Sequence, residues 1–195
     1  KERLKRTKAK SERKKVTEAR VSTTDPDARV MKMADGGYRP AYNVQLATDV
    51  ASGMIVGVTV LNQGNDAGQA PPLEAQVAQR TGSHPGAYLI DGGYAQRETI
   101  TDLADRQVTV YAPVRPPRTT TSERERSTPR SDDSPAVVAW RQRMETEEAK
   151  RLYKLRAATA EWANAQARGH GLLPFTVRGL GKVLSVVLLV TIAHN

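Results

Sequence analysis

Asp91 is the residue whose position in this sequence points most directly to chemistry. It follows an apolar segment, residues 87–90, that predicts a buried strand, and it precedes Gly92 and Gly93. A carboxylate at the carboxyl end of a strand, beside backbone that carries no side chains, can bind a divalent metal ion and approach a phosphate. The alternative is that Asp91 only caps a turn, because Asp-Gly is a common turn pair. This position alone leaves both interpretations open.

A second group of polar residues lies on a predicted helix near the C-terminus. Tyr153, Arg156, Glu161 and Arg168 are separated mainly by alanines and other apolar residues. On an α-helix with about 100° between residues, Glu161 lies about 80° from Tyr153 and about 20° from Arg168. Arg156 lies on the flank, about 140° from Glu161. A solvated charged face is the alternative interpretation, but the charges are sparse on an otherwise apolar helix.

The segments that position these residues predict strands alternating with helices. Residues 42–50 and 54–61 are rich in β-branched residues, and the compact turn between them predicts a hairpin. The other predicted elements are helices over 71–80, 96–106 and 136–168, with a possible break near Thr146, a buried helix over 180–193, and strands over 87–90 and 108–114. This order predicts an α/β protein with a mixed sheet covered by helices.

Composition restricts the class of protein and of site. The 195 residues have a formal net charge of +9 and a pI of about 10.0, which fits a polyanionic partner such as DNA. The sequence contains no cysteine, which excludes a disulfide scaffold, a thiolate zinc site and a cysteine nucleophile. His84, His170 and His194 are far apart in the sequence and are each interpreted as an isolated surface or loop residue.

Two segments are predicted to lie outside the packed domain. Residues 1–23 form a basic arm, helical or disordered, and residues 115–135, rich in Pro, Thr, Ser, Arg and Asp, form a flexible insertion. The longest apolar run, residues 183–193, is too short for a membrane span, which takes about 20 residues. We therefore expect a cytoplasmic, nucleoid-associated protein. The abrupt start and end predict an excised or truncated piece.

Several stretches of the sequence are informative when they are taken together and in order. They are residues 24–29 (TDPDAR) with 41–45 (AYNVQ), residues 89–94 (LIDGGY), the spaced set Tyr153, Arg156, Glu161 and Arg168, and the tail over 178–195. In this order, across residues 24–195, they resemble bacterial insertion-sequence transposases of the DDE class, in the C-terminal part of the catalytic domain.

The resemblance implies a fold and a set of site residues. The fold would be similar to ribonuclease H and retroviral integrase, with a mixed sheet flanked by helices. Three carboxylates would hold two Mg²⁺ (or Mn²⁺) ions, with Asp91 as the second and Glu161 as the third. Tyr153 and Arg156 resemble residues that contact DNA phosphate. Arg168 stands where the family usually has lysine, so the charge is kept but a planar fork replaces a point charge.

The first carboxylate of the family lies on a first strand, upstream of the Asp-Pro-Asp-Ala-Arg turn. Only the basic arm precedes that turn here. Asp25, Asp27 and Asp49 are the local candidates, but none has the expected surroundings, and Asp49 is interpreted as a turn residue. We therefore expect this chain to lack the first strand and its carboxylate, and to show no cleavage alone with Mg²⁺.

The function implied is DNA transposition, by metal-dependent strand cleavage and strand transfer at the ends of an insertion sequence. The partners would be element ends and target DNA, with a homodimer forming on DNA. Three alternatives remain: a non-catalytic DNA-binding protein, a ribonuclease H-like host nuclease, and the inactive product of a decayed element. In the first alternative, replacing Asp91 or Glu161 would have no effect. In a transposase it would abolish strand transfer and leave DNA binding intact.

Overall fold

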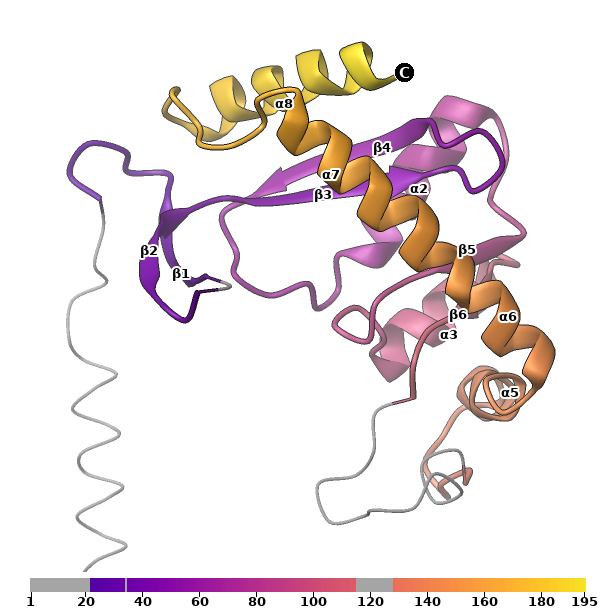
Figure 1. Ribbon diagram of the computed structural model, residues 1–195. Helices are drawn as coiled ribbons and strands as arrows, with labels where there is room; N and C mark the ends of the chain where they lie inside the picture. Colours follow the sequence, from indigo (N-terminus) through magenta and orange to yellow (C-terminus); the bar gives the residue numbers. More distant parts are fainter. Residues whose placement is uncertain (1–21, 34, 115–127) are drawn as a thin grey trace, which may run out of the picture.

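The computed structural model describes residues 22–33, 35–114 and 128–195 (Figure 1). The predicted basic arm up to residue 21 and residues 115–127 of the predicted insertion lie outside the described residues. Six strands form three pairs in this part of the chain. They are β1 (Arg29–Lys32) with β2 (Tyr38–Ala41), antiparallel; β3 (Asn43–Thr48) with β4 (Ile55–Leu61), antiparallel; and β5 (Ala87–Leu89) with β6 (Thr109–Tyr111), parallel.

Helices follow and cover the last two strand pairs. They are α2 (Ala70–Thr81), α3 (Arg97–Asp105), α5 (Pro135–Arg143), α6 (Glu147–Arg156), a π-helical turn η1 (Ala157–Glu161), α7 (Trp162–Gly169) and α8 (Leu180–His194). Figure 1 shows α6 and α7 crossing in front of both the β3–β4 and the β5–β6 pair. The mixed α/β character is confirmed. The β1–β2 pair was not expected, and the strands form separate pairs where one sheet was expected.

The hairpin of β3 and β4 closes as its sequence predicts. The Asp49 amide donates to the Met54 carbonyl at 2.8 Å, and the Asp49 carboxylate accepts from the Ser52 amide and hydroxyl at 2.8 and 2.6 Å. These bonds from Ser52 lower the pKa of the Asp49 carboxyl. Gly53 takes a φ of +75°, which favours glycine. The interpretation of Asp49 as a turn residue is confirmed.

Backbone hydrogen-bonding groups on the outer edge of β4 are paired with side chains from other parts of the fold. The Asn195 amide group accepts from the Ile55 N–H at 2.8 Å and donates to the Ile55 carbonyl at 3.0 Å. Gln76 of α2 accepts from the Val58 N–H at 2.7 Å. Backbone groups at a sheet edge need such partners when no further strand pairs with them. β4 is therefore closed on the side away from β3.

Backbone carbonyls on the outer edge of β6 accept hydrogen bonds from side chains of α5 in a similar way. The Trp140 indole N–H donates to the Ala112 carbonyl at 3.1 Å, just beyond the strand, and Arg143 donates to the Val110 carbonyl at 3.0 Å. Trp140 is also almost fully buried in the core beside this strand. Helix α5 thus fixes β6 by packing and by hydrogen bonds together.

The buried apolar residues form two main clusters. One joins β5 and β6 to α3 and α5 through residues such as Ile100, Leu103 and Val137. The other joins β3 and β4 to α7 and α8 through Ala163, Ala167, Val183 and Val187. Helix α8 buries only one face, because Leu189 and Ile192 remain 66% and 72% exposed. The expectation of a buried helix over residues 180–193 is therefore wrong for its outer face.

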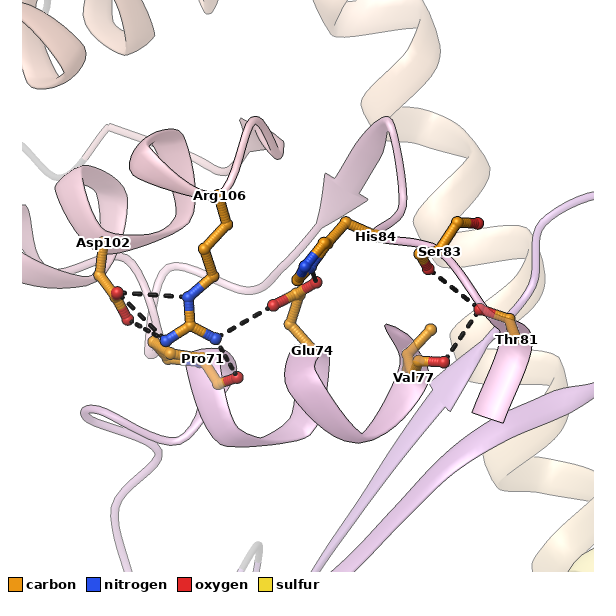
Figure 2. Close-up of polar contacts among 8 residues, drawn as sticks. All are labelled: Pro71, Glu74, Val77, Thr81, Ser83, His84, Asp102 and Arg106. Atoms are coloured by element: carbon orange, nitrogen blue, oxygen red, sulfur yellow. Dashed lines mark hydrogen bonds and ion pairs between the residues drawn. The ribbon is translucent and has the colours of Figure 1, made fainter. Parts of the chain in front are cut away.

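A buried carboxylate joins α2 to α3 (Figure 2). The Glu74 side chain is fully buried, and its oxygens lie 2.6 Å from His84 Nδ1 and 3.2 Å from Arg106 Nη1. Arg106 also pairs with Asp102 at 2.8 Å and donates to the Pro71 carbonyl at 3.2 Å. A buried charge is tolerated only when it is paired in this way.

Two of the three histidines are not isolated, contrary to expectation. His84 takes part in the pair with Glu74, although half of its side chain is exposed. His194 Nε2 lies 3.0 Å from the Gly53 carbonyl oxygen, and its ring packs edge-on against Trp162 with 5.0 Å between ring centroids. Gly53 and His194 are 141 positions apart, and Glu74 and His84 are 10 positions apart across the end of α2, so neither contact follows from a local spacing pattern.

Candidate active site

A cavity of about 650 Å³ lies between β3 and β5. β3 and its turn contribute one wall, and β5 with Ile90 and Asp91 contributes the opposite wall. Leu73 and Val77 of α2 line a third side, and the α6–η1–α7 segment closes the fourth with Leu152 and Ala160 among others. The cavity therefore brings together elements that carry most of the residues selected from the sequence.

Asp91 lies at the carboxyl end of β5, where the sequence places it. The Ile90 amide donates to the Tyr111 carbonyl at 3.0 Å, which extends the pairing of β5 with β6 up to this point. The Asp91 carboxylate is exposed, and Oδ1 accepts from the Gly92 amide at 2.7 Å. The turn-capping alternative is therefore present in the geometry. This bond is made by one carboxylate oxygen, Oδ1, and Asp91 also lines the cavity.

Tyr153 and Arg156 lie near Asp91. Burial raises the pKa of the Tyr153 phenol, and the charge of Asp91 raises it further, while Arg156 acts in the opposite direction. The phenol is therefore protonated at neutral pH and can donate a hydrogen bond. Arg156 is half-buried and lines the cavity. The structure thus brings together Asp91, Tyr153 and Arg156, which come from elements far apart in the sequence.

Tyr94 is a further neighbour of this group that was not predicted as a site residue. Burial raises the pKa of its phenol, as do the negative charges of Asp66 and Asp91, and Arg156 opposes them. Tyr94 stands in the Asp-Gly-Gly-Tyr stretch that carries part of the family resemblance, so the motif itself contained the signal. Its amide donates to the Asp91 carbonyl at 2.9 Å, which fixes the turn.

Gln45 and Asp66 are further residues that sequence reasoning missed. Asp66 accepts from the Asn43 and Gln45 side-chain amides at 2.8 and 3.1 Å. Gln45 is only 3% exposed and lines the cavity. Its Oε1 has no hydrogen-bond partner among the described residues. A buried acceptor without a donor is costly, which marks this wall as a place for a ligand.

Glu161 and Arg168 do not lie with this group. Both side chains are exposed, and neither lines the cavity, although Ala160 and Asn164 on either side of Glu161 do. The helical segment is not a regular α-helix throughout, because η1 is a π-helical turn that ends at Glu161. The angle expected between Tyr153 and Glu161 is therefore wrong, whereas Glu161 and Arg168 are joined by the regular helix α7. Single π-helical turns occur often at functional sites.

The helix break near Thr146 is confirmed. Arg143 ends α5, and α6 begins after Thr146, whose hydroxyl accepts from the Ala149 amide at 3.2 Å. Thr146 is thus an N-cap that starts α6 in a new direction. Tyr153 and Arg156 lie on the helix that begins here.

Asp25 and Asp27, candidates for the first carboxylate, anchor the start of α8. Asp25 accepts from the Tyr42 hydroxyl at 2.7 and 2.8 Å and from the Gly179 amide at 3.3 Å, and Asp27 accepts from the Leu180 amide at 3.0 Å. Carboxylates stabilise a helix N-terminus through its free amides and its dipole.

The titration of Asp25 and Tyr42 reflects their contact. Burial acts to raise the pKa of the Asp25 carboxyl, but the hydrogen bonds from Tyr42 and from backbone amides hold it below its usual value. Burial, together with this contact, raises the pKa of Tyr42 to about 12. These interactions fix the N-terminal turn to α8, so both aspartates have a structural role in the described fold.

The described carboxylates are suitable ligands for a divalent metal ion, but too few of them lie together to bind one. Carboxylate oxygens are the ligands that Mg²⁺ and Mn²⁺ prefer. Among the described residues, however, no three acidic, histidine or cysteine side chains gather closely enough to hold an ion. Asp91 is therefore suited to be one ligand of a site that these residues alone do not complete.

The fold and site define a mixed α/β protein with a carboxylate, a phenol and a guanidinium gathered at the end of a strand. Residues 11–195 match the family model described as the transposase DDE domain. The chain therefore belongs to the DDE transposase family, whose members act on DNA in transposition and generally use divalent metal ions. No curated protein and no solved structure matches the chain.

The family match agrees with the resemblance found from the ordered motifs, which is thereby confirmed. It covers nearly the whole chain, including most of the basic arm. In the part of the chain that the structure describes, no helix is both long and apolar enough to cross a membrane.

Proposed function

We propose that this chain is part of the catalytic domain of an insertion-sequence transposase with a ribonuclease H-like fold, which cleaves DNA at element ends and joins it to target DNA. The observation that carries the proposal is the position of Asp91. It lies at the carboxyl end of β5 and at the wall of a cavity, with Tyr153 and Arg156 nearby. Family membership supports the same conclusion.

Each of these residues has a distinct role in the proposal. Asp91 binds the metal ion as the second carboxylate. Arg156 neutralises phosphate charge, since a guanidinium makes strong charge-assisted hydrogen bonds to phosphate oxygens. The protonated Tyr153 donates a hydrogen bond to the same backbone. Arg168, exposed on α7, and the basic residues 1–23 attract DNA independently of its sequence, within a homodimer that forms on DNA.

Mg²⁺ or Mn²⁺ is the proposed cofactor, held by Asp91 and Glu161 with a further carboxylate. When bound, such ions activate the attacking oxygen and stabilise the leaving oxygen. Glu161 does not line the cavity in this structure. Its use as a metal ligand therefore involves a conformational change of η1, the turn that ends at Glu161. Because the described residues do not gather three ligands, the chain alone is expected to show no cleavage with Mg²⁺.

The test is strand transfer by the complete transposase carrying Asp91→Asn. We expect transfer to fall by about 10³-fold, because a metal ion contributes several kcal/mol of charge stabilisation. Binding to element-end DNA should stay within about twofold, because backbone contacts dominate affinity. Both are measured on labelled element-end DNA. The matched control is Asp105→Asn, an exposed carboxylate at the end of α3, which should retain activity.

Unchanged transfer in the Asp91→Asn protein would refute the catalytic assignment and favour a non-catalytic DNA-binding protein. Cleavage that depends on Asp91 without strand joining would indicate the host nuclease alternative. Terminal inverted repeats beside the coding sequence would support the transposase independently of either assay.

A further inference from the structure

The antiparallel pair of β1 and β2 forms a two-stranded ribbon that lies outside the two main buried clusters. Neither cluster contains a residue of these strands. Figure 1 shows the pair at the left edge of the molecule, apart from the labelled helices. Its turn is closed by the Met33 amide, which donates to the Gly37 carbonyl at 2.8 Å, and by the Gly36 amide, which donates to the Met33 carbonyl at 3.0 Å. We call this pair the β1–β2 ribbon.

One face of the β1–β2 ribbon holds it to the rest of the fold. Side chains alternate between the two faces of a strand, so Met31 and its cross-strand partner Arg39 share a face. Met31 is buried, and a Cβ added at Gly64, in the loop after β4, would lie 3.4 Å from Met31 Cγ. Arg39 pairs with Asp35 of the turn. This face is therefore already in use.

The opposite face of the β1–β2 ribbon is open. It consists of two cross-strand pairs, Val30 with Pro40 and Lys32 with Tyr38. All four side chains are exposed, Tyr38 at 70% and Val30 at 43%. Within the described part of the chain, none of the four makes a hydrogen bond or an ion pair. An aromatic ring, aliphatic groups and a cation gathered on an open face are typical of a contact surface.

The charge of the β1–β2 ribbon indicates a polyanionic partner. Its basic residues are Arg29, Lys32 and Arg39. Its acidic residue, Asp35, pairs with Arg39, so the charges of Arg29 and Lys32 have no acidic partner among the described residues. DNA is the polyanion on which members of the family act, and uncompensated cations attract its phosphates.

The outer edge of β2 is unsuited to pairing with a strand of another protein. Hydrogen-bonded and non-bonded pairs alternate along an antiparallel ladder, and Met33 with Gly37 is a bonded pair. Pro40 therefore stands in a non-bonded pair, and its nitrogen points away from β1. Because proline has no N–H, this edge lacks a donor at that position. A partner is thus expected to contact side chains of the ribbon and not to extend its ladder.

The connection to β3 fixes the β1–β2 ribbon relative to the candidate active site. A single residue, Tyr42, joins β2 to β3, and its hydroxyl donates to Asp25 at 2.7 Å. Val44 and Gln45, which follow, line the cavity opposite Asp91. A duplex bound by the ribbon is therefore held in a defined position beside this cavity.

We propose that the β1–β2 ribbon inserts its open face into the major groove of double-stranded DNA. Two strands about 4.8 Å apart form a ribbon that the major groove, about 12 Å wide, admits. Tyr38 contacts base edges, and Lys32 binds a flanking phosphate. DNA as the occupant rests on the proposed function, whereas the ribbon is a surface separate from the cavity and from the carboxylates of that function.

The contribution of the ribbon is measured by fluorescence anisotropy of the whole chain with a labelled duplex of arbitrary sequence. Tyr38→Ala should weaken binding at least about fivefold, and Lys32→Gln should reduce the slope of log affinity against log salt by about one. Both side chains are exposed, so the unfolding midpoint in urea should not change. The matched control is Arg80→Gln, an exposed cation at the end of α2, which should leave the slope unchanged.

The groove is identified with a duplex of the same sequence whose cytosines carry a glucosylated hydroxymethyl group, which fills the major groove. The unmodified chain should bind this duplex about fivefold more weakly than the ordinary one, because the groove is closed to the ribbon. The Tyr38→Ala chain should bind the two duplexes alike. Equal binding of both duplexes by the unmodified chain would overturn insertion into the major groove.

The position of the DNA is tested by crosslinking. The sequence contains no cysteine, so Val30→Cys provides a single attachment point for a photoreactive benzophenone. Irradiation should crosslink this chain to the duplex, whereas the chain with Gln79→Cys on the exposed face of α2 should not crosslink. Crosslinking of the Val30→Cys chain to a second copy in place of DNA, equal crosslinking by both variants, or unchanged affinity of the Tyr38→Ala chain would overturn the proposal.

These readouts are independent of strand transfer. A transposase that binds DNA only through other surfaces would lose transfer on Asp91→Asn and still give none of the expected results with the ribbon variants. A chain that binds DNA through the ribbon but has no catalytic role would give the opposite pattern. The two failures are therefore distinguishable.

Discussion

The carboxylate of Glu74 lies inside the protein, on a helix face that otherwise buries Leu73 and Val77. Its charge is tolerated because His84 and Arg106 approach it from two different segments (Figure 2). The four-residue spacing of Leu73 and Val77 predicts helix α2, but nothing in the local sequence distinguishes Glu74 from a solvated glutamate. Its role depends entirely on partners that the fold supplies.

Glu74→Ala should destabilise the chain by about 2 kcal/mol, because it removes the hydrogen bonds of a fully buried side chain and leaves a cavity in its place. The measurement is urea unfolding followed by circular dichroism. Gln79→Ala on the exposed face of the same helix is the matched control and should change stability by less than about 0.5 kcal/mol. A similar small change for both variants would show that the buried pair adds little to stability.

Asp91 shows what single residues of the sequence can reveal. An apolar strand followed by Asp-Gly-Gly defines a carboxylate at a strand end from local information alone, and the structure has it there. The expectation that this strand is buried is wrong, because Ala87 is exposed and Tyr88 and Leu89 are only half-buried. Asp25 and Asp27 show the limit. Their bonds to Gly179 and Leu180 join opposite ends of the described chain, and no local pattern contains that contact.

At the scale of elements, the π-helical turn η1 lies between α6 and α7, whose residues contact different parts of the fold. On its N-terminal side Arg156 faces the cavity, and on its C-terminal side Ala163 and Ala167 pack in the core beside α8. A π-helical turn accommodates one extra residue within an α-helix, so both flanking faces keep their directions.

Deletion of Ala158, an exposed residue of this turn, should convert η1 into regular α-helix and change stability by no more than about 1 kcal/mol. Deletion of Ala165 in the regular helix α7 is the control. It rotates Ala167 away from the core and should cost about 2 kcal/mol or more. Thermal unfolding compares the two.

Equal losses from the two deletions would contradict the view of η1 as an inserted residue. In the complete transposase, the Ala158 deletion should also abolish strand transfer if a change at η1 brings Glu161 to the metal ion as proposed. A helical period of 3.6 residues cannot reveal such a turn, because it assumes the regular geometry that the turn interrupts. The predicted strands and helices were otherwise confirmed to within a few residues, since hydrophobic periodicity and turn residues specify elements locally.

At the scale of the whole molecule, the positive charge is the property most relevant to DNA. The net charge is +9, and the sequence of the N-terminal segment is dense in lysine and arginine. Contacts between such residues and phosphate release counterions, so affinity depends steeply on salt.

Binding of the chain to double-stranded DNA should therefore weaken by about 10³-fold or more between 50 and 200 mM salt, if about six phosphates are contacted. Fluorescence anisotropy with a labelled duplex of arbitrary sequence measures this. Removal of residues 1–20 should reduce the slope of log affinity against log salt. An unchanged slope would show that residues 1–20 make no phosphate contact.

The arrangement of the strand pairs illustrates what sequence could not predict at this scale. A hairpin such as β3–β4 is specified by its turn, whereas the parallel pairing of β5 with β6 depends on residues about twenty positions apart and on the helix between them. β3 and β5 lie on opposite sides of the cavity, and no local pattern in the sequence records this arrangement.

The contact between Asn195 and Ile55 has a consequence for the behaviour of the protein in concentrated solution. By occupying both backbone groups of Ile55, the Asn195 side chain blocks an end of β4 that would otherwise template pairing with another molecule. Protection against aggregation at this end of β4 therefore resides in a side chain 140 positions away in the sequence. Loss of that side chain would expose a strand to intermolecular association and lower solubility, even where the core and the candidate site remain intact.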